Sequence, residues 1–215
     1  MMFDLAYTSG VMLPNPAIIK VEKLDVAKRQ LNAAVRAFFN GADPIAVHTL
    51  VGAGANIASD LAEHRTSRKS WDNRCAQDNR LTKAEYFRIA REAQNFFKHA
   101  VYDPSGELDF DQRDTEMLLM MASLNLGELN QPGETHSIEL SVFQLWYIAR
   151  WSAIWKPDDR AMEPLLEDAG RMFPGFEELS RDEQIRRGNK VLELELSKRQ
   201  HKRHSTRTRF DRRTS

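Results

Sequence analysis

One stretch of the sequence, residues 82–100, places polar side chains of several chemical types on one side of a predicted helix. At about 100° per residue, two cations, a carboxylate, an amide and an imidazole fall within roughly 100° of one another. We call this set, with the flanking Lys98, the polar ridge: Arg88, Arg91, Glu92, Asn95, Lys98 and His99. The cations suit phosphate groups, and an imidazole serves as general acid or base near neutral pH. The pattern is equally typical of the solvent face of an amphipathic helix, so both interpretations stay open.

The same stretch carries the features of a complete amphipathic helix. Thr82 and Glu85 form a capping box at its start, and the helix is expected to end near Ala100, before Asp103-Pro104. The side opposite the polar ridge is apolar and is predicted to face the core: Tyr86, Ile89, Ala90, Ala93, Phe96, Phe97 and Ala100.

Helical periodicity also dominates the rest of the chain, and no alternating strand pattern of convincing length is present. Helices are predicted at 23–39, 44–63, 113–129, 137–155 and 162–172, and from Ser180 into the C-terminal region. Asn40-Gly41 ends the first and Asp43-Pro44 begins the second, so these two helices must form an antiparallel hairpin. Small residues in the second helix, among them Gly52 and Gly54, predict close packing. Residues 64–81 are predicted to be a polar, basic loop.

These elements predict an all-α, single-domain irregular helical bundle built on antiparallel helix hairpins. We expect an extended N-terminal arm over residues 1–22 and the bundle over residues 23–197. The tryptophan-rich helix is expected to be buried core, and His48 a hydrogen-bonded packing residue.

Charge divides the chain sharply at residue 198. Residues 198–215 hold eight Lys or Arg and one acid, whereas the preceding part carries 23 basic and 30 acidic side chains. A tail of charge +7 thus follows a body of charge −7, and we expect this tail to be disordered. Its cations, including Lys202, Arg203, Arg207 and Arg209, would release counterions on meeting RNA or another polyanion. Docking on an acidic protein partner is the alternative.

The string Gln94-Asn95-Phe96-Phe97-Lys98-His99 resembles the signature of HEPN domains, which are all-helical modules. The family motif is an arginine, a polar residue and a histidine four to six residues beyond the arginine. Asn95 matches the polar position and His99 the histidine, while Gln94 stands where the family has arginine. The strings FFNGADP and NFFKHA also resemble a group of uncharacterised bacterial helical proteins.

The HEPN resemblance implies a homodimer that brings two such motifs together. Many members are metal-independent ribonucleases, in which the histidine activates the ribose 2′-hydroxyl. On that reading His99 and Asn95 are the candidate catalytic residues, and Arg88, Arg91 and Lys98 contact phosphate.

Several classes of protein are excluded or disfavoured by composition. No apolar run is long enough for a membrane span, and a single cysteine, Cys75, rules out an intrachain disulfide framework. The carboxylates at 103–114 lack the spacing of a calcium loop, so neither a metal nor a cofactor is expected. A cytoplasmic location is expected.

Two functions therefore compete at this level. The first is a HEPN-like protein that contacts RNA or another polyanion and cleaves it without metal. The second is a non-catalytic, dimerising protein-interaction module with a basic tether. The sequence leaves open whether the protein is an enzyme.

Overall fold

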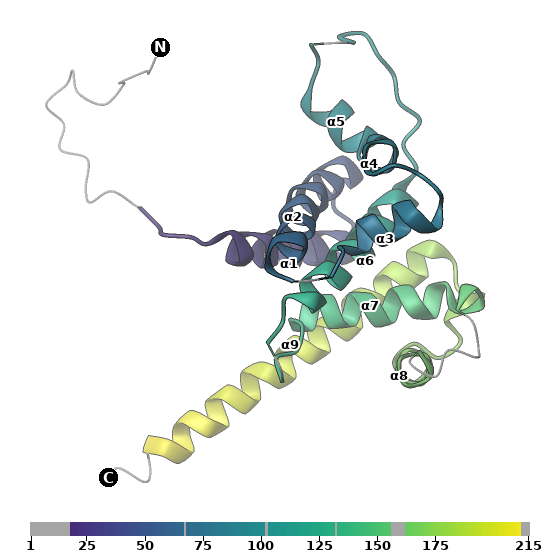
Figure 1. Ribbon diagram of the computed structural model, residues 1–215. Coiled ribbons are helices and arrows are strands. Elements are labelled where there is room, and N and C mark those ends of the chain that lie inside the picture. Colours follow the sequence, from purple (N-terminus) through teal and green to yellow (C-terminus); the bar gives the residue numbers. More distant parts are fainter. Residues whose placement is uncertain (1–17, 67, 102, 132, 156–161, 212–215) are drawn as a thin grey trace, which may run out of the picture.

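The computed structural model describes residues 18–66, 68–101, 103–131, 133–155 and 162–211, and all regular secondary structure within them is helical (Figure 1). The all-α prediction is confirmed. The elements are α1 (Lys23–Phe39), α2 (Pro44–Arg65), α3 (Trp71–Asp78), α4 (Lys83–Ala90), α5 (Glu92–Lys98), α6 (Gln112–Glu128), α7 (Ile138–Arg150), η1 (Ser152–Ile154), α8 (Glu163–Met172), η2 (Phe176–Glu178) and α9 (Arg181–Asp211).

The hairpin of α1 and α2 forms as its capping residues predict. Gly41 has a φ of 67°, which glycine tolerates, and the Asp43 side chain accepts hydrogen bonds from the amides of Ile45 and Ala46. Gly54 lies so close to α1 that an added Cβ would stand 2.7 Å from Leu31 Cγ. The small residues of α2 therefore allow the close packing that the sequence predicted.

An aromatic cluster at the crossing of α1 and α7 forms the centre of the core. Trp146 is fully buried, and its ring packs against Phe38, Phe39 and Phe143 at centroid distances of 5.2–5.8 Å. The core role predicted for this tryptophan is confirmed. Helix α7 ends at Arg150, earlier than predicted, because the chain leaves helical geometry at Trp151 (φ −114°, ψ 30°).

A buried charged cluster joins α6, α7 and the start of α9. The Glu116 side chain is completely buried, and each of its oxygens lies 3.0 Å from a guanidinium nitrogen, one of Arg150 and one of Arg181. Burial raises the pKa of Glu116, and the two guanidiniums act against that rise. The Glu116 carboxylate thus forms ion pairs that connect α6 with α7 and with α9.

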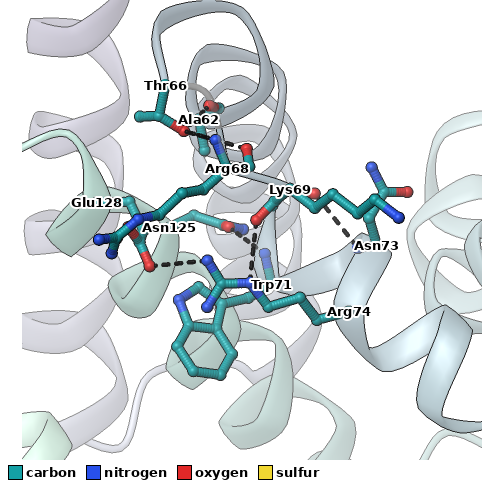
Figure 2. A network of polar contacts seen from close by, with 10 residues as sticks. Ala62, Thr66, Arg68, Lys69, Trp71, Asn73, Arg74, Asn125 and Glu128 are labelled. Atoms are coloured by element: carbon teal, nitrogen blue, oxygen red, sulfur yellow. Dashed lines mark hydrogen bonds and ion pairs between the residues drawn. The ribbon is translucent and has the colours of Figure 1, made fainter.

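The segment predicted as a loop at 64–81 contains a helix, α3, so that prediction was wrong. The Ser70 hydroxyl caps α3 by accepting from the amide of Asn73. The buried Asn125 of α6 accepts from the amide of Trp71 and donates to the Asp72 carboxylate, at 2.8 Å in each case. Figure 2 shows Arg74 reaching Glu128 from beside the Trp71 ring. Tertiary bonds thus stabilise a helix too short to be stable alone.

Residues 198–211 are also helical, contrary to the disorder we expected from residue 198, and residues 212–215 lie outside the described part of the chain. Helix α9 continues to Asp211 and extends away from the bundle (Figure 1, yellow). Residues 189–211 include no glycine or proline, and Lys, Arg and Gln have good helix propensity. An ion pair between Glu195 and Lys198 supports the helix where it leaves the body. None of the helices in the described ranges has the length and apolar character needed to cross a bilayer.

Candidate functional site

The polar ridge is interrupted, because the single helix predicted over 82–100 is broken into α4 and α5. Arg91 has φ −116° and ψ 11°, which ends α4 and begins α5. The capping box of Thr82 and Glu85 is present as predicted. Ile89, expected in the core, is 55% exposed.

Four residues of the polar ridge still meet on one surface. Arg88, Glu92, Asn95 and His99 line a shallow depression of about 540 Å³. His99 caps the end of α5, where its amide donates to the Asn95 carbonyl at 3.2 Å. The structure therefore brings the two candidate catalytic residues together, with Arg88 nearby. The Lys98 side chain is exposed but does not line this depression.

The charge of the depression is predominantly negative. Asp103 and Glu107, from the segment between α5 and α6, join Glu92 in its lining, so three carboxylates stand against the one arginine. Carboxylates oppose the approach of a phosphate group, particularly where they are more numerous than the cations. This acidity could not be read from helical spacing, because two of the carboxylates come from the neighbouring loop.

Arg91 does not lie with the other ridge residues. It is half-buried, and its guanidinium stacks over the Phe87 ring at 3.8 Å. Burial lowers the pKa of Arg91, while Asp72 and Asp60 oppose that change. Because it packs on an aromatic ring, Arg91 contributes to the interior of the α4–α5 unit.

Gln94, at the arginine position of the HEPN-like motif, is buried against α2. Gln94 is 1% exposed, and an added Cβ on Gly52 would stand 2.4 Å from the side-chain nitrogen, Nε2, of Gln94. Its Oε1 accepts from Asn56 Nδ2 at 3.3 Å, whereas Nε2 has no partner. The motif is therefore divided between two faces of α5, with Gln94 inside and both Asn95 and His99 outside.

A second site surrounds His48, which lies on α2 and is 1% exposed. Its Nδ1 is 2.9 Å from Thr115 Oγ1, and its ring meets those of Phe97 and Phe110 edge to face. The packing role predicted for His48 is confirmed. Burial, with a smaller effect of Lys98, lowers the pKa of His48 to about 4, so the ring is neutral at pH 7.

The His48 ring also forms part of the wall of a cavity of about 150 Å³, which we call the His48 cavity. Its Nε2 is buried and has no hydrogen-bond partner. No sequence pattern predicted this cavity, because its lining residues come from α2, α4, α5, α6 and the segment before α6, which only the tertiary fold brings together.

The cations expected to contact RNA in the C-terminal region lie along α9. Lys198 and Arg199 are exposed. The side chains of Lys202, Arg203, Arg207 and Arg209 lie outside the described part of the structure, although the backbone of α9 runs through these positions. Within the described residues, no group of three or more His, Cys, Asp or Glu side chains is placed to hold a metal ion.

Comparison with known proteins adds no family assignment. No protein-family model matches the chain, and searches of curated proteins and of solved structures found no significant similarity.

Proposed function

We propose that this protein binds RNA through the C-terminal part of α9 and does not cleave it at the polar ridge. The observation that carries the proposal is the continuation of α9 beyond the bundle. From Lys198 to His201 every side chain is exposed, and the helical backbone extends to Asp211. Fourteen helical residues span about 20 Å at 1.5 Å per residue.

Charge supports this location for RNA binding. Residues 198–211 include six Lys or Arg and one acid, whereas the chain before them is acidic by seven charges. A polyanion is repelled by the body and attracted to this helix, where neutralised phosphates release condensed counterions. Binding of this kind tolerates many sequences and weakens steeply with salt. The choice of RNA as ligand rests on the HEPN-like motif.

Cleavage is left out of the proposal because of the charge around His99. Three carboxylates share its depression, and neither Gln94 nor Arg91 supplies a cation there. A phosphodiester next to His99 would meet one cation, Arg88, against three carboxylates, so the net charge there would oppose a developing oxyanion. Homodimerisation, which the HEPN resemblance implies, remains a prediction to be measured by sedimentation.

The test is the salt dependence of binding to a single-stranded RNA. Each phosphate contact contributes a slope of about 0.7 to the fall of log affinity with log salt concentration. We expect neutralising Lys198, Arg199, Lys202 and Arg203 to glutamine to lower the slope by about 3 and to weaken binding at least tenfold. The matched control removes four charges outside residues 198–211 by replacing Lys20, Lys23, Lys69 and, in the first part of α9, Lys190 with glutamine.

If the control variant lost as much RNA affinity as the first variant, net charge alone would explain the effect. The assignment of RNA binding to the C-terminal part of α9 would then be overturned. Absence of RNA affinity at physiological salt would overturn the proposal and favour the protein-interaction module. Cleavage of the RNA in EDTA by wild type, absent in His99→Ala, would overturn the claim that the ridge does not cleave.

A further inference from the structure

A hollow of about 650 Å³ lies where α1, the segment after α6 and the basic part of α9 meet. We call it the Lys28 pocket. Lys28 and Asn32 of α1 and Arg199 of α9 line it, and Asn130 and residues 134–137 supply its other polar side chains. The pocket therefore lies directly beside the stretch of α9 that carries the proposed RNA-binding charge.

The net charge of the Lys28 pocket is positive, in contrast to the depression beside His99. Two cations, Lys28 and Arg199, line it against one carboxylate, Glu134. Burial lowers the pKa of His136 below its ordinary value of 6.5, Lys28 lowers it further and Glu134 opposes the change, so this ring is neutral at pH 7. The pocket thus attracts an anion, although the body of the protein as a whole is acidic.

Both cations are accessible to a ligand. Arg199 is exposed and forms no ion pair within the described residues. The Lys28 side chain is 35% exposed, and its ammonium lies 2.8 Å from Oε1 of Glu134, whose side chain is 41% exposed. An ion pair this exposed is weak, so an anion of higher charge can replace Glu134 at Lys28.

Two amide side chains add uncharged hydrogen-bond donors. Asn32 Oδ1 accepts from the Ser137 hydroxyl at 2.6 Å, and the side-chain nitrogens of Asn32 and Asn130 have no partner among the described residues. Neither nitrogen is one of the buried atoms that lack a partner, so solvent reaches both. Two cations and two free amides together suit an anion with several oxygens, such as a phosphate.

We propose that the Lys28 pocket binds the terminal phosphate of an RNA chain that lies along α9, with Lys28 and Arg199 as the cations that hold it. This inference rests on the RNA binding proposed above. A terminal phosphate carries about 1.5 to 2 negative charges at pH 7, so it gains more from two cations than an internal phosphate with one charge. Because Arg199 belongs both to the pocket and to the exposed stretch of α9, a chain held here by its end continues onto that helix.

The experiment measures the affinity of the full chain for one short single-stranded RNA in three forms, with a 5′-phosphate, with a 3′-phosphate and with hydroxyls at both ends. We expect one of the phosphorylated forms to bind at least about tenfold more tightly than the hydroxyl form, because hydrogen bonds between charged groups are strong. Equal affinity for all three forms would overturn the phosphate pocket and leave RNA binding by α9 intact.

Lys28→Gln tests the pocket, because Arg199 also belongs to the RNA-binding stretch. The matched control is Arg29→Gln, since Arg29 is the next residue of α1, also forms an exposed ion pair and does not line the pocket. We expect Lys28→Gln to abolish the preference for the phosphorylated end and Arg29→Gln to keep it. Loss of the preference in both variants, or in neither, would overturn the assignment to Lys28.

Glu134→Gln should strengthen the same preference. It removes the carboxylate that competes with phosphate for Lys28, and we expect the preference to rise about threefold. The matched control, Asp25→Asn, frees Arg29 in the same way and should leave the preference unchanged. A preference that did not rise in Glu134→Gln would contradict the placement of the phosphate on Lys28.

Adenosine 5′-monophosphate and adenosine separate this inference from the function proposed above, because neither is long enough to lie along α9. Calorimetry should detect binding of the monophosphate, weakened in Lys28→Gln, and no binding of adenosine. That result without any affinity for RNA would overturn RNA binding by α9 and retain the pocket as a phosphate site. Failure of the monophosphate to bind, together with an affinity for RNA that does not depend on its end, would overturn the pocket alone.

Discussion

Two interior regions of this molecule bury polar groups of different kinds, one charged and one neutral. At the junction of α6, α7 and α9, both oxygens of the buried Glu116 meet guanidinium groups. At the junction of α2, α5 and α6, His48 and Gln94 are equally buried, yet each has a nitrogen without a partner. Both regions lie in the same helical bundle, so the difference between them comes from the side chains that pack around each buried group.

The comparison separates stabilisation by charge from incomplete hydrogen bonding. A buried carboxylate between two guanidiniums fixes the helices that supply those cations through charge, even though Glu116 Oε2 and Arg150 Nε form an ion pair at 3.0 Å without a hydrogen bond. A neutral group with one free nitrogen costs stability unless something fills the space beside it. The first junction is therefore stabilised by balanced charge, and the second holds neutral groups that are incompletely bonded.

The largest effect on stability is expected at Glu116, whose buried charge is balanced by two guanidiniums. Glu116→Gln would leave the partly buried guanidiniums of Arg150 and Arg181 without their counter-charge. Breaking a buried charge cluster in this way costs about 3–5 kcal/mol, and we expect that loss in the free energy of unfolding measured with urea.

The matched control is Glu134→Gln, which removes the exposed ion pair with Lys28. Surface pairs contribute at most about 1 kcal/mol, so this variant should remain close to wild type. Comparable losses in the two variants would show that balanced charge does not stabilise the junction around Glu116.

The next effect concerns His48 and depends on pH. The unfolded chain protonates this imidazole near its ordinary pKa of about 6.5, whereas the folded chain does so at about 4. Between these values the unfolded state binds more protons, so the free energy of unfolding falls as pH falls. The contribution is complete above pH 6.5, and about 3 kcal/mol of it is lost by pH 4.

Urea unfolding of wild type and His48→Gln at several pH values between 7 and 4 measures this contribution. We expect the stability of the wild type to fall more steeply than that of the variant, because the other titrating groups are shared. Parallel curves would show that His48 is not a buried neutral imidazole.

The sequence predicted some of these elements correctly and missed others. The hairpin of α1 and α2, the capping box of Thr82 and Glu85 and the burial of Trp146 followed from local spacing and cap chemistry, and all are present. Helix α3 was missed because bonds to Asn125, more than fifty residues away, stabilise it. Local propensity contains no information about such a partner.

The candidate site was foretold only in part, for the same reason. Asn95 and His99 do lie together, as helical spacing predicted. The break at Arg91, the inward position of Gln94 and the carboxylates beside His99 all depend on how α5 meets α2 and the loop that follows it. These are tertiary effects, and periodicity within a single helix does not report them.

The smallest effect is expected at Gln94, and it sharpens the comparison between buried amides. Gln94 makes one long bond, at 3.3 Å, and leaves Nε2 unpaired, so Gln94→Met should change the free energy of unfolding by no more than about 1 kcal/mol. Asn125→Leu is the matched control, because that amide bonds both Trp71 and Asp72 and should cost about 1–3 kcal/mol. Urea unfolding of both variants decides. If Gln94→Met were as costly as Asn125→Leu, the Gln94 amide would be structural, and the junction of α2 and α5 would not be the loosely paired region that we infer.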